Sequence, residues 1–323
     1  MKAKILRTDA ELFIIEQYLD ELSGIADVVT TESHAEDELV RAAKDADIIL
    51  TCYTNITAKV INAAPRLKGI VKYGVGTDAI DIEAATAKGV MVANSPDYGS
   101  DTVADHAFAL MISLARKIPT LDRVMRENAW VWPTPELLGV DLAGKSVGLI
   151  GFGRIGRAMS RRCEGFSMTR LVFDPYVEPT SVGEYGVAFV PFDELLERSD
   201  FVSIHSVLTP ETRGLIDAAA LQKMKETAYL IDVSRGAIID EDALIHAINN
   251  NLIAGAGFDV FSHEPLTSDY PLLGRDNVIL TPHLAWWTKE AFERVERDTL
   301  DGIRDILAGK TPKNLNNTEV LER

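Results

Sequence analysis

Short apolar runs alternate with segments of helical periodicity along the first hundred residues. Between the runs, residues 10–22 and 35–46 repeat apolar positions every three to four residues, which is typical of amphipathic helices. Alternation of strands and helices predicts a parallel sheet covered by helices. Residues 1–100 are therefore expected to form a small α/β domain. The predicted strands are 3–7, 26–30, 46–50, 68–74 and 89–94.

After residue 100 the pattern changes and then restarts. A long helix is predicted over 100–127; its nine-residue apolar stretch 107–115 is too short to cross a bilayer and is expected to be buried. After an irregular, proline-containing connection, strands and helices alternate again, which predicts a second parallel sheet. An amphipathic helix near 288–308 and a polar tail end the chain. The predicted strands are 146–150, 170–174, 187–190, 200–204, 228–232, 253–258 and 277–281, and the helices are 154–164, 191–198 and 240–249.

Composition narrows the class of protein. A chain of 323 residues is long enough for two domains. Its net charge of −16, without a basic stripe, gives no reason to expect a nucleic-acid partner. The N-terminus lacks the apolar core of a signal peptide, so we expect a cytoplasmic protein without membrane attachment. Cys52 and Cys163 show neither disulfide nor zinc spacing, so no metal site is expected.

A glycine-rich turn lies between a predicted strand and a predicted helix. Gly151, Gly153 and Gly156 match the pattern G-x-G-x-x-G. In such turns the first glycine permits the tight turn, the second lets a pyrophosphate approach, and the third lets helix and strand pack closely. The helix N-terminus adds free N–H groups and a positive dipole end. This context predicts a dinucleotide-binding site.

Asp174 ends the next predicted strand, 18 residues after Gly156. An acid at about this spacing accepts hydrogen bonds from the ribose 2′-OH and repels a 2′-phosphate. The alternative is an aspartate that caps the turn before Pro175. The dinucleotide interpretation predicts NAD rather than NADP.

Hydride transfer to or from a dinucleotide needs a proton donor or acceptor beside the substrate oxygen. His205 and His283 both follow predicted strands, where open α/β sheets bind ligands, and location alone does not separate them. Arg235 and Glu264 follow two other strands on the same rim. An arginine can bind a carboxylate in a bidentate manner, and a carboxylate beside a histidine favours its protonated form. The alternative is a set of loop-tip salt bridges.

The motifs together resemble the D-isomer-specific 2-hydroxyacid dehydrogenase family along nearly the whole chain. The glycine turn is joined by 71–82, 94–116, 205–216, 233–244, 257–266 and 281–287 in the order typical of that family. The stretches "PDYGSDTVADHA" and "PHLAWW" are most similar to the branch that holds the C-terminal-binding-protein corepressors and their bacterial dehydrogenase relatives.

The resemblance implies a fold and an assembly. A Rossmann-type doubly wound parallel sheet over 101–287 would bind NAD and would be inserted into a flavodoxin-like α/β substrate domain, made of 1–100 plus 288–323. The active site would lie between the two domains. The segment 120–145 would help to build a homodimer.

The resemblance also implies residue roles. Arg235 would bind the substrate carboxylate and polarise the keto oxygen, His283 would be the acid–base residue, and Glu264 would pair with it. Val75 and Gly76 would offer backbone N–H groups to the substrate carboxylate. The other implied contacts are Arg154 and Ile155 to the pyrophosphate, Thr102 and Asp259 to the nicotinamide, His205 to the cofactor cleft, and Trp286 to the substrate pocket, or to the core or dimer interface instead.

This sequence departs from the family at two positions. Asp232 replaces the usual Asn three residues before Arg235, and Val207 replaces the usual Pro after His205. Glu264 is the ordinary acid rather than the Gln of the formate dehydrogenase branch, which favours acid–base catalysis on a hydroxy acid.

Residues 50–57 align with the loop that meets the distal end of the substrate. Thr51, Cys52 and Tyr53 supply no positive charge there, which disfavours 3-phosphoglycerate. Tyr53 and Trp286 suggest an uncharged 2-keto acid. The sequence thus predicts an NAD-dependent oxidoreductase that interconverts a D-2-hydroxy acid and its 2-keto acid. The alternative is an NAD(H)-sensing regulator that binds proteins, as the corepressors do.

Overall fold

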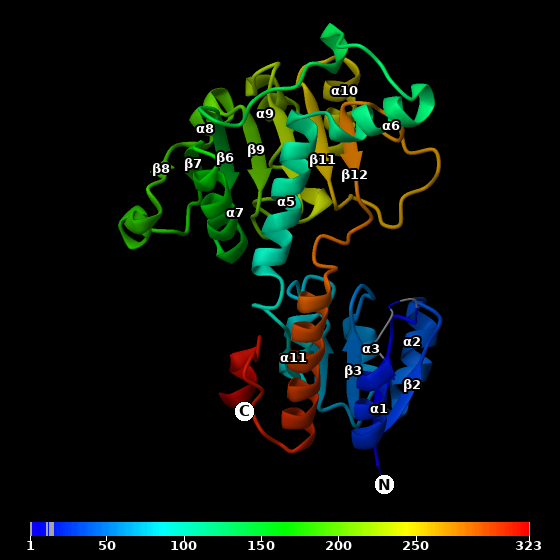
Figure 1. Cartoon of the computed structure of the whole chain (residues 1–323). Coiled ribbons are helices and arrows are strands. Elements are labelled where there is room, and N and C mark those ends of the chain that lie inside the picture. The colour runs from blue at the N-terminus through cyan, green and yellow to red at the C-terminus, as the bar shows by residue number, and fades with distance from the viewer. Residues whose placement is uncertain (1, 11, 13–15, 323) are drawn as a thin grey trace. The chain divides into compact units, whose positions relative to one another are not determined.

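The computed structural model describes residues 2–10, 12 and 16–322 of the chain. It divides into two compact units (Figure 1). One unit contains residues 1–99 and 288–323, and the other contains residues 100–287. The second unit therefore interrupts the first in sequence.

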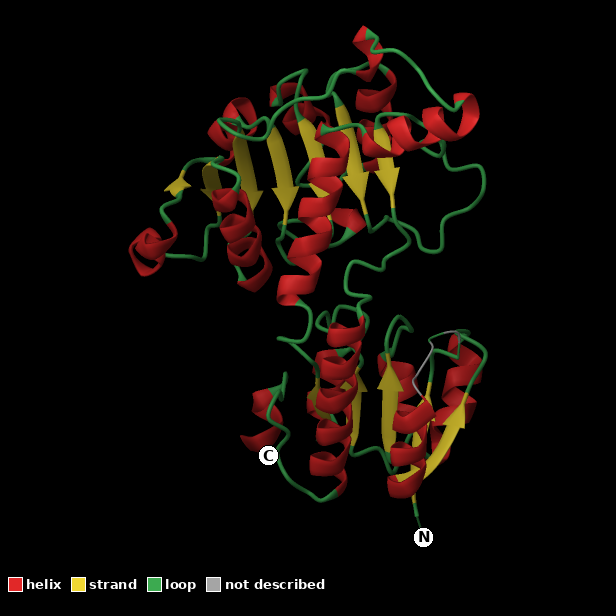
Figure 2. Ribbon diagram, viewed as in Figure 1, coloured by secondary structure: helices red, strands yellow, loops and turns green. Residues whose placement is uncertain are grey.

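The first unit is built on a five-stranded parallel sheet with the order β2-β1-β3-β4-β5 (Figure 2). Its central strands β3 and β4 are buried at every position, as expected for strands covered by helices on both faces. The strands are β1 (Ala3–Arg7), β2 (Ala26–Thr30), β3 (Ile48–Thr51), β4 (Gly69–Lys72) and β5 (Met91–Ala93). The helices are α1 (Glu16–Ile25), α2 (Glu36–Ala42), α3 (Ala58–Ala63), α4 (Ile82–Ala87) and α11 (Lys289–Leu307), with 3-10 helices at Ala43–Asp45 and Thr318–Glu322.

The C-terminal segment is anchored to this unit despite its polar composition. Asn317 is completely buried. Its amide oxygen accepts from the Val92 backbone N–H, and its amide nitrogen donates to the Val90 carbonyl oxygen. These hydrogen bonds tie the tail to the strand that ends the sheet.

The second unit is built on a seven-stranded parallel sheet with the order β12-β11-β10-β9-β6-β7-β8 (Figure 2). Apolar side chains cover both faces: α5 and α7 contribute to one core, and α8, α9 and α10 contribute to the other. The strands are β6 (Ser146–Ile150), β7 (Thr169–Phe173), β8 (Ala188–Phe189), β9 (Phe201–Ile204), β10 (Tyr229–Asp232), β11 (Gly255–Phe258) and β12 (Val278–Leu280). The helices are α5 (Ser100–Ala115), α6 (Ile118–Asn128), α7 (Arg154–Gly165), α8 (Phe192–Arg198), α9 (Ala218–Lys223) and α10 (Glu241–Asn249), with 3-10 helices at Pro135–Leu137, Pro179–Tyr185 and Gly236–Ile238.

The predicted long helix over 100–127 is wrong in one respect, because it is two helices. Lys117 adopts a left-handed conformation (φ 52°) between α5 and α6. Pro119 lies in the first turn of α6, where its missing N–H costs no helical hydrogen bond. The buried helix expected over 107–115 is part of α5. Among the helices of the described residues, none has the length and hydropathy that crossing a bilayer requires.

Candidate active site and its relatives

Three neighbouring strands of the seven-stranded sheet carry the predicted catalytic residues beyond their carboxyl ends. Arg235 follows β10, Glu264 follows β11 and His283 follows β12. The three strands are adjacent and parallel, so the segments that leave them begin at the same edge of the sheet.

Glu264 and His283 form a close pair. Glu264 Oε2 lies 2.6 Å from His283 Nδ1, and both side chains are partly buried. The other carboxylate oxygen, Oε1, accepts a hydrogen bond from the Phe261 backbone N–H (2.9 Å). Because an ionised carboxylate can only accept, the proton in this contact lies on Nδ1.

His283 itself has a left-handed backbone (φ 55°), which is uncommon for a residue with a Cβ. The loop around it is held by Asp259, which is completely buried. Asp259 Oδ1 accepts from the Thr281 hydroxyl (2.6 Å) and the Leu284 N–H (2.9 Å), and Oδ2 accepts from the Ala285 N–H (2.7 Å). Asp259 thus fixes the segment that presents His283.

Asp232 lies at the base of the turn that carries Arg235. It is completely buried, and its Oδ1 accepts from the Ser234 N–H (2.7 Å) and hydroxyl (2.6 Å). Its Oδ2 has no hydrogen-bond partner among the described residues. Burial raises the pKa of this carboxyl to about 7, against the opposing effects of Ser234 and Arg235. The side chain is therefore mostly protonated below about pH 7 and ionises as the pH rises through that value.

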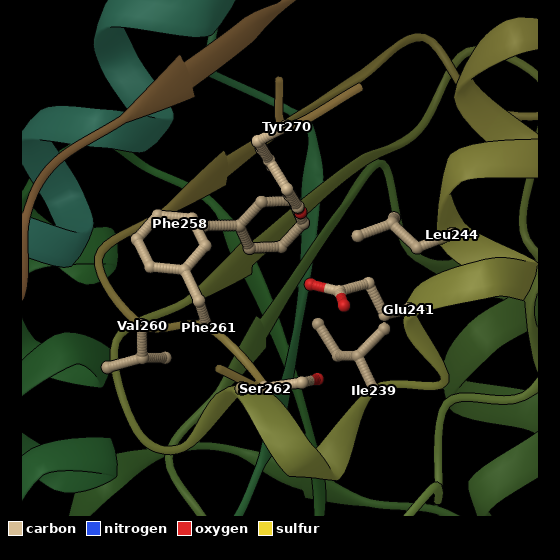
Figure 3. A pocket seen from close by; sticks show the side chains of 9 residues that line it. Ile239, Glu241, Leu244, Phe258, Val260, Phe261, Ser262 and Tyr270 are labelled. Carbon is tan, nitrogen blue, oxygen red and sulfur yellow. The ribbon is translucent and has the colours of Figure 1, made fainter. Parts of the chain in front are cut away.

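The Arg235 turn and the Glu264 loop pack backbone to backbone. A Cβ on Gly236 would lie 2.1 Å from the carbonyl carbon of Phe261, so only glycine fits this contact. Figure 3 shows a pocket that residues of both segments line, including Gly236 and Phe261. The Phe261 ring packs edge-on against Tyr270, with the ring centroids 5.8 Å apart. The loop that carries Glu264 is therefore held by a backbone contact and a ring contact.

The glycine turn has the close contacts that its pattern predicts. Gly151 has φ 93°, and a Cβ there would lie 2.6 Å from the Ser206 backbone nitrogen. A Cβ on Gly156 would lie 2.2 Å from the Gly151 carbonyl oxygen. A Cβ on Gly153, by contrast, would meet nothing within 4 Å. The space beside Gly153 is thus open to a ligand.

The remaining predicted dinucleotide contacts surround this turn. Arg154 and Ile155 are the first residues of α7, whose N-terminal N–H groups are available to an anion. Asp174 lies just after β7, and its Oδ2 accepts from the Phe152 N–H (2.7 Å) inside the glycine turn. Its other oxygen accepts from the Tyr176 N–H (2.9 Å). Asp174 therefore stabilises the glycine turn and caps the turn after β7, with lone pairs left over for a ribose.

His205 is partly buried, and Thr102 is buried. His205 Nε2 lies 2.9 Å from the Ser203 hydroxyl, and burial lowers the His205 pKa to about 3. An imidazole with this pKa is uncharged near neutral pH. Thr102 is buried in the first turn of α5. Val207, two residues beyond His205, is 72% exposed.

Trp286 is buried, at 6% exposure, and its ring packs edge-on against the Trp287 ring with the centroids 4.9 Å apart. Both follow the loop held by Asp259. The structure gives Trp286 a packing role, and its place beside a substrate stays a prediction.

The predicted substrate contacts of the other unit lie beyond the carboxyl ends of β3 and β4. Val75 is exposed, and it follows Gly74, whose φ of 136° favours glycine. Tyr53 is 40% exposed. The ammonium of Lys72, the last residue of β4, lies 5.8 Å from the centroid of the Tyr53 ring.

Sequence reasoning missed Lys72. The interpretation that Tyr53 has no positive charge nearby considered only the neighbouring residues of its own loop, and Lys72 comes from the adjacent strand. Lys72 is buried although it is charged, and it directly precedes the glycine-containing segment that includes Val75. A charged residue at the end of an otherwise apolar strand is the signal that could have identified it.

Comparisons with known proteins place these features in a family. The profile of the D-isomer specific 2-hydroxyacid dehydrogenase NAD-binding domain matches residues 108–285. A glyoxylate reductase of Korarchaeum cryptofilum is 41% identical over 287 residues, which cover 88% of this chain and 86% of that protein. A D-3-phosphoglycerate dehydrogenase of Mycobacterium tuberculosis is 40% identical over 275 residues, which cover 85% of this chain but only 52% of that protein.

Solved structures agree with the sequence comparisons. The D-lactate dehydrogenase of Aquifex aeolicus, solved with NAD and lactic acid, matches with a TM-score of 0.85 and 28% identity over 98% of this chain and 97% of that one. These relatives are dehydrogenases and reductases. The comparisons therefore confirm membership of the wider family but do not support the predicted similarity to the corepressor branch. This chain belongs to the D-isomer specific 2-hydroxyacid dehydrogenase family and is an NAD-dependent oxidoreductase that interconverts 2-hydroxy and 2-keto acids.

Proposed function

We propose that the protein reduces a small 2-keto acid to the D-2-hydroxy acid and uses Arg235, Glu264 and His283 for the chemistry. The observation that carries this proposal is the 2.6 Å pair of Glu264 and His283. These two residues follow β11 and β12, which come next in the sheet after β10, the strand that precedes Arg235. NADH, when bound, would supply the hydride that forms the new C–H bond at C2 of the keto acid. As the C=O double bond becomes a single bond, His283 gives its Nε2 proton to the keto oxygen, which forms the hydroxyl group and leaves His283 neutral.

Each of the three side chains has a distinct part in this step. Arg235 forms bidentate hydrogen bonds with the substrate carboxylate and polarises the neighbouring carbonyl. Glu264 accepts from Nδ1, which fixes the imidazole ring and stabilises its positive charge before proton transfer. In the reverse direction His283 takes the hydroxyl proton as a base.

We infer that NAD binds at the glycine turn of a Rossmann-type sheet. The strand order of the second unit, counted from its first strand, is 3-2-1-4-5-6-7, which contains the 3-2-1-4-5-6 order of dinucleotide-binding sheets. The open space at Gly153 and the N-terminus of α7 fit a pyrophosphate, and the Asp174 carboxylate favours a free 2′-OH over a 2′-phosphate. Thr102, His205 and Asp259 remain proposed contacts on the nicotinamide side.

We infer that the substrate carboxylate also meets the backbone N–H groups of Val75 and Gly76, at the end of a sheet with the flavodoxin-like order 2-1-3-4-5. Tyr53 and Trp286 would limit the substrate side chain. The names of relatives support a small 2-keto acid whose side chain is uncharged, since three of these relatives are glyoxylate reductases. The proximity of Lys72 to Tyr53 is the observation that favours a second candidate, an acid with an anionic group, as in the phosphoglycerate dehydrogenases.

The test is oxidation of NADH against glyoxylate, pyruvate, hydroxypyruvate, 2-ketoisocaproate, phenylpyruvate and 3-phosphohydroxypyruvate. We expect turnover of uncharged acids and a loss of about 10²–10⁴-fold in kcat with His283→Ala. His246→Ala is the matched control because His246 is exposed on α10, and it should retain full activity. Full activity of the His283 variant would contradict the acid–base assignment, and preference for the phosphorylated acid would favour the second candidate.

We also propose that two copies of the chain associate through α6 and the segment that follows it. No residue of α6 is buried although one face of the helix is apolar. Trp130, Trp132 and Leu138 in the next segment are 68%, 78% and 75% exposed. Apolar side chains grouped on the surface in this way are typical of protein–protein interfaces.

A further inference from the structure

Asp9 is a buried carboxylate that the chemistry proposed above does not use. It follows β1, is 2% exposed, and accepts hydrogen bonds from three consecutive backbone N–H groups of the loop after β3. Cys52 donates to Oδ2 (2.7 Å), and Tyr53 (2.8 Å) and Thr54 (3.1 Å) donate to Oδ1. The hydroxyl of Thr8 (2.8 Å) contacts Oδ2, and the hydroxyl of Thr54 (3.1 Å) contacts Oδ1.

These donors decide the charge of Asp9. Burial alone would raise the pKa of the carboxyl, but the backbone N–H groups of Cys52 and Tyr53 and the hydroxyls of Thr8 and Thr54 outweigh it and hold the pKa below its usual value. Asp9 is therefore ionised near neutral pH, and each of its hydrogen bonds involves a full negative charge.

Converging backbone N–H groups form an anion-binding concavity. In this loop the anion is a side chain of the protein itself. The loop conformation therefore depends on a charge supplied from the neighbouring strand. Thr54 is further held by His34, whose Nδ1 lies 2.7 Å from the Thr54 hydroxyl.

Tyr53 is the residue that this arrangement places. Its backbone N–H is bound by Asp9, and its partly exposed ring lies beside the Lys72 ammonium. Two separate contacts, one to the backbone and one to the ring, restrict where the phenol can lie.

We infer that Asp9 is a positioning residue for substrate selection, because its carboxylate fixes the loop 51–54 and so the Tyr53 ring. This inference rests on the proposed function, in which Tyr53 limits the substrate side chain. A purely structural role for Asp9 would lower stability without a selective effect on the keto acid.

Asp9→Asn tests the inference, with Asp47→Asn as the matched control. Asparagine offers one acceptor and one donor where two acceptors are needed, so its NH₂ group would face an N–H of the loop. Asp47 is also buried, precedes the same strand β3 at its other end, and accepts from the Lys4 N–H (2.9 Å) and from Arg66 (2.8 Å). A general loss of stability in this unit would therefore affect both variants.

Two readouts are needed. Hydrogen–deuterium exchange of a peptide that contains residues 52–54 should be about tenfold or more faster in Asp9→Asn and unchanged in Asp47→Asn. In steady-state kinetics Asp9→Asn should raise the KM of the keto acid by about tenfold, change the relative rates among the acids of the panel, and leave the KM of NADH within about twofold. Thr54→Val removes only one donor to Asp9, so it should change the exchange rate and the KM of the keto acid in the same direction but by less. This variant replaces Asp9→Asn if Asp9→Asn does not fold.

The outcomes separate this inference from the proposed function. Unchanged exchange in Asp9→Asn overturns the positioning role whatever the activity. Faster exchange with unchanged KM values overturns the link to the substrate. If Tyr53→Ala alters the KM of the keto acid and Asp9→Asn does not, the proposed function stands and the inference falls. If the unmodified enzyme reduces no acid of the panel, both fall.

Discussion

Three buried aspartates at the carboxyl ends of strands differ in how hydrogen bonds compensate for their burial. Asp9 and Asp259 receive hydrogen bonds on both carboxylate oxygens. These bonds replace the water that burial removes, and those to Asp9 hold its pKa below the usual value. Asp232 receives them on one oxygen only. A carboxyl in that position is stabilised by keeping its proton, and this agrees with its raised pKa of about 7.

The raised pKa of Asp232 predicts how stability depends on pH. The unfolded carboxyl loses its proton near pH 4, whereas the folded one keeps it up to about pH 7. Between these values the folded state binds more protons, so the free energy of unfolding falls as the pH rises and levels off above the folded pKa. The fall amounts to about 2 kcal/mol between pH 5 and pH 7.

Asp232→Asn removes this dependence, because the amide has no charge and its oxygen can still accept from Ser234. The measurement is the thermal unfolding midpoint of both proteins at pH 5, 6, 7 and 8. The unfolding midpoint of the variant, compared with that of the unmodified protein, should increase as the pH rises. The other titratable groups at this sheet edge, His106, His205, Asp259, Glu264 and His283, are common to both proteins and cancel. A constant difference between the two proteins would contradict a raised pKa.

At the scale of elements, two glycines of the strand–turn–helix motif have different roles, one in NADH binding and one in the stability of the turn. Gly153→Ala should fold normally, because its φ of −72° suits alanine and the new methyl group meets no protein atom within 4 Å. We expect that methyl group to obstruct the pyrophosphate and to raise the KM of NADH by about tenfold or more. Steady-state titration of NADH at saturating keto acid measures this effect.

Gly156→Ala is the counterpart within the same motif. Its methyl group would lie 2.2 Å from the backbone oxygen of Gly151, so the turn itself must move. We expect a loss of about 1–3 kcal/mol in the free energy of unfolding as well as weaker NADH binding. Normal NADH affinity in Gly153→Ala would show that the pyrophosphate lies elsewhere.

The alternating pattern predicted the strands well because parallel strands buried on both faces are continuous apolar runs. The short helices α3, α4 and α9 were missed, since six residues give too little periodicity. Each begins after a capping side chain: Thr57, Asp81 and Asp217 accept from the third residue of the helix that follows. These caps were the available signal.

Some residues of the candidate site could likewise be proposed from the sequence, and others could not. Arg235, Glu264 and His283 could be proposed from the sequence because each lies in the segment after a predicted strand, and a parallel sheet gathers its strand ends at one edge. The parts played by Asp9, Lys72 and Asp259 could not, because each depends on contacts with residues far away in sequence. Sequence identified Asp232 only as a departure from the family; its protonation depends on burial, which the structure supplies.

At the scale of the whole molecule, the first unit needs both ends of the chain. Glu296 on α11 accepts a hydrogen bond from the Tyr73 hydroxyl (2.7 Å) beyond β4, and Asn317 bonds to β5. The five-stranded sheet is thus completed by segments that are made after the entire second unit. Truncation before α11 should therefore destabilise the first unit, although all five of its strands remain.

The apolar surface of α6 and of the segment after it predicts the assembly of the enzyme. Trp132 and Leu138 are the most exposed apolar side chains there, and in a dimer their burial would contribute free energy in proportion to the area covered. We expect Leu138→Glu to convert a dimer into monomers, because a buried unpaired charge opposes association. Sedimentation velocity at micromolar concentration measures this. Leu273→Glu, on another exposed site of the same unit, should leave the dimer intact. A monomeric unmodified protein, or a dimer that persists in both variants, would show that this surface has another purpose.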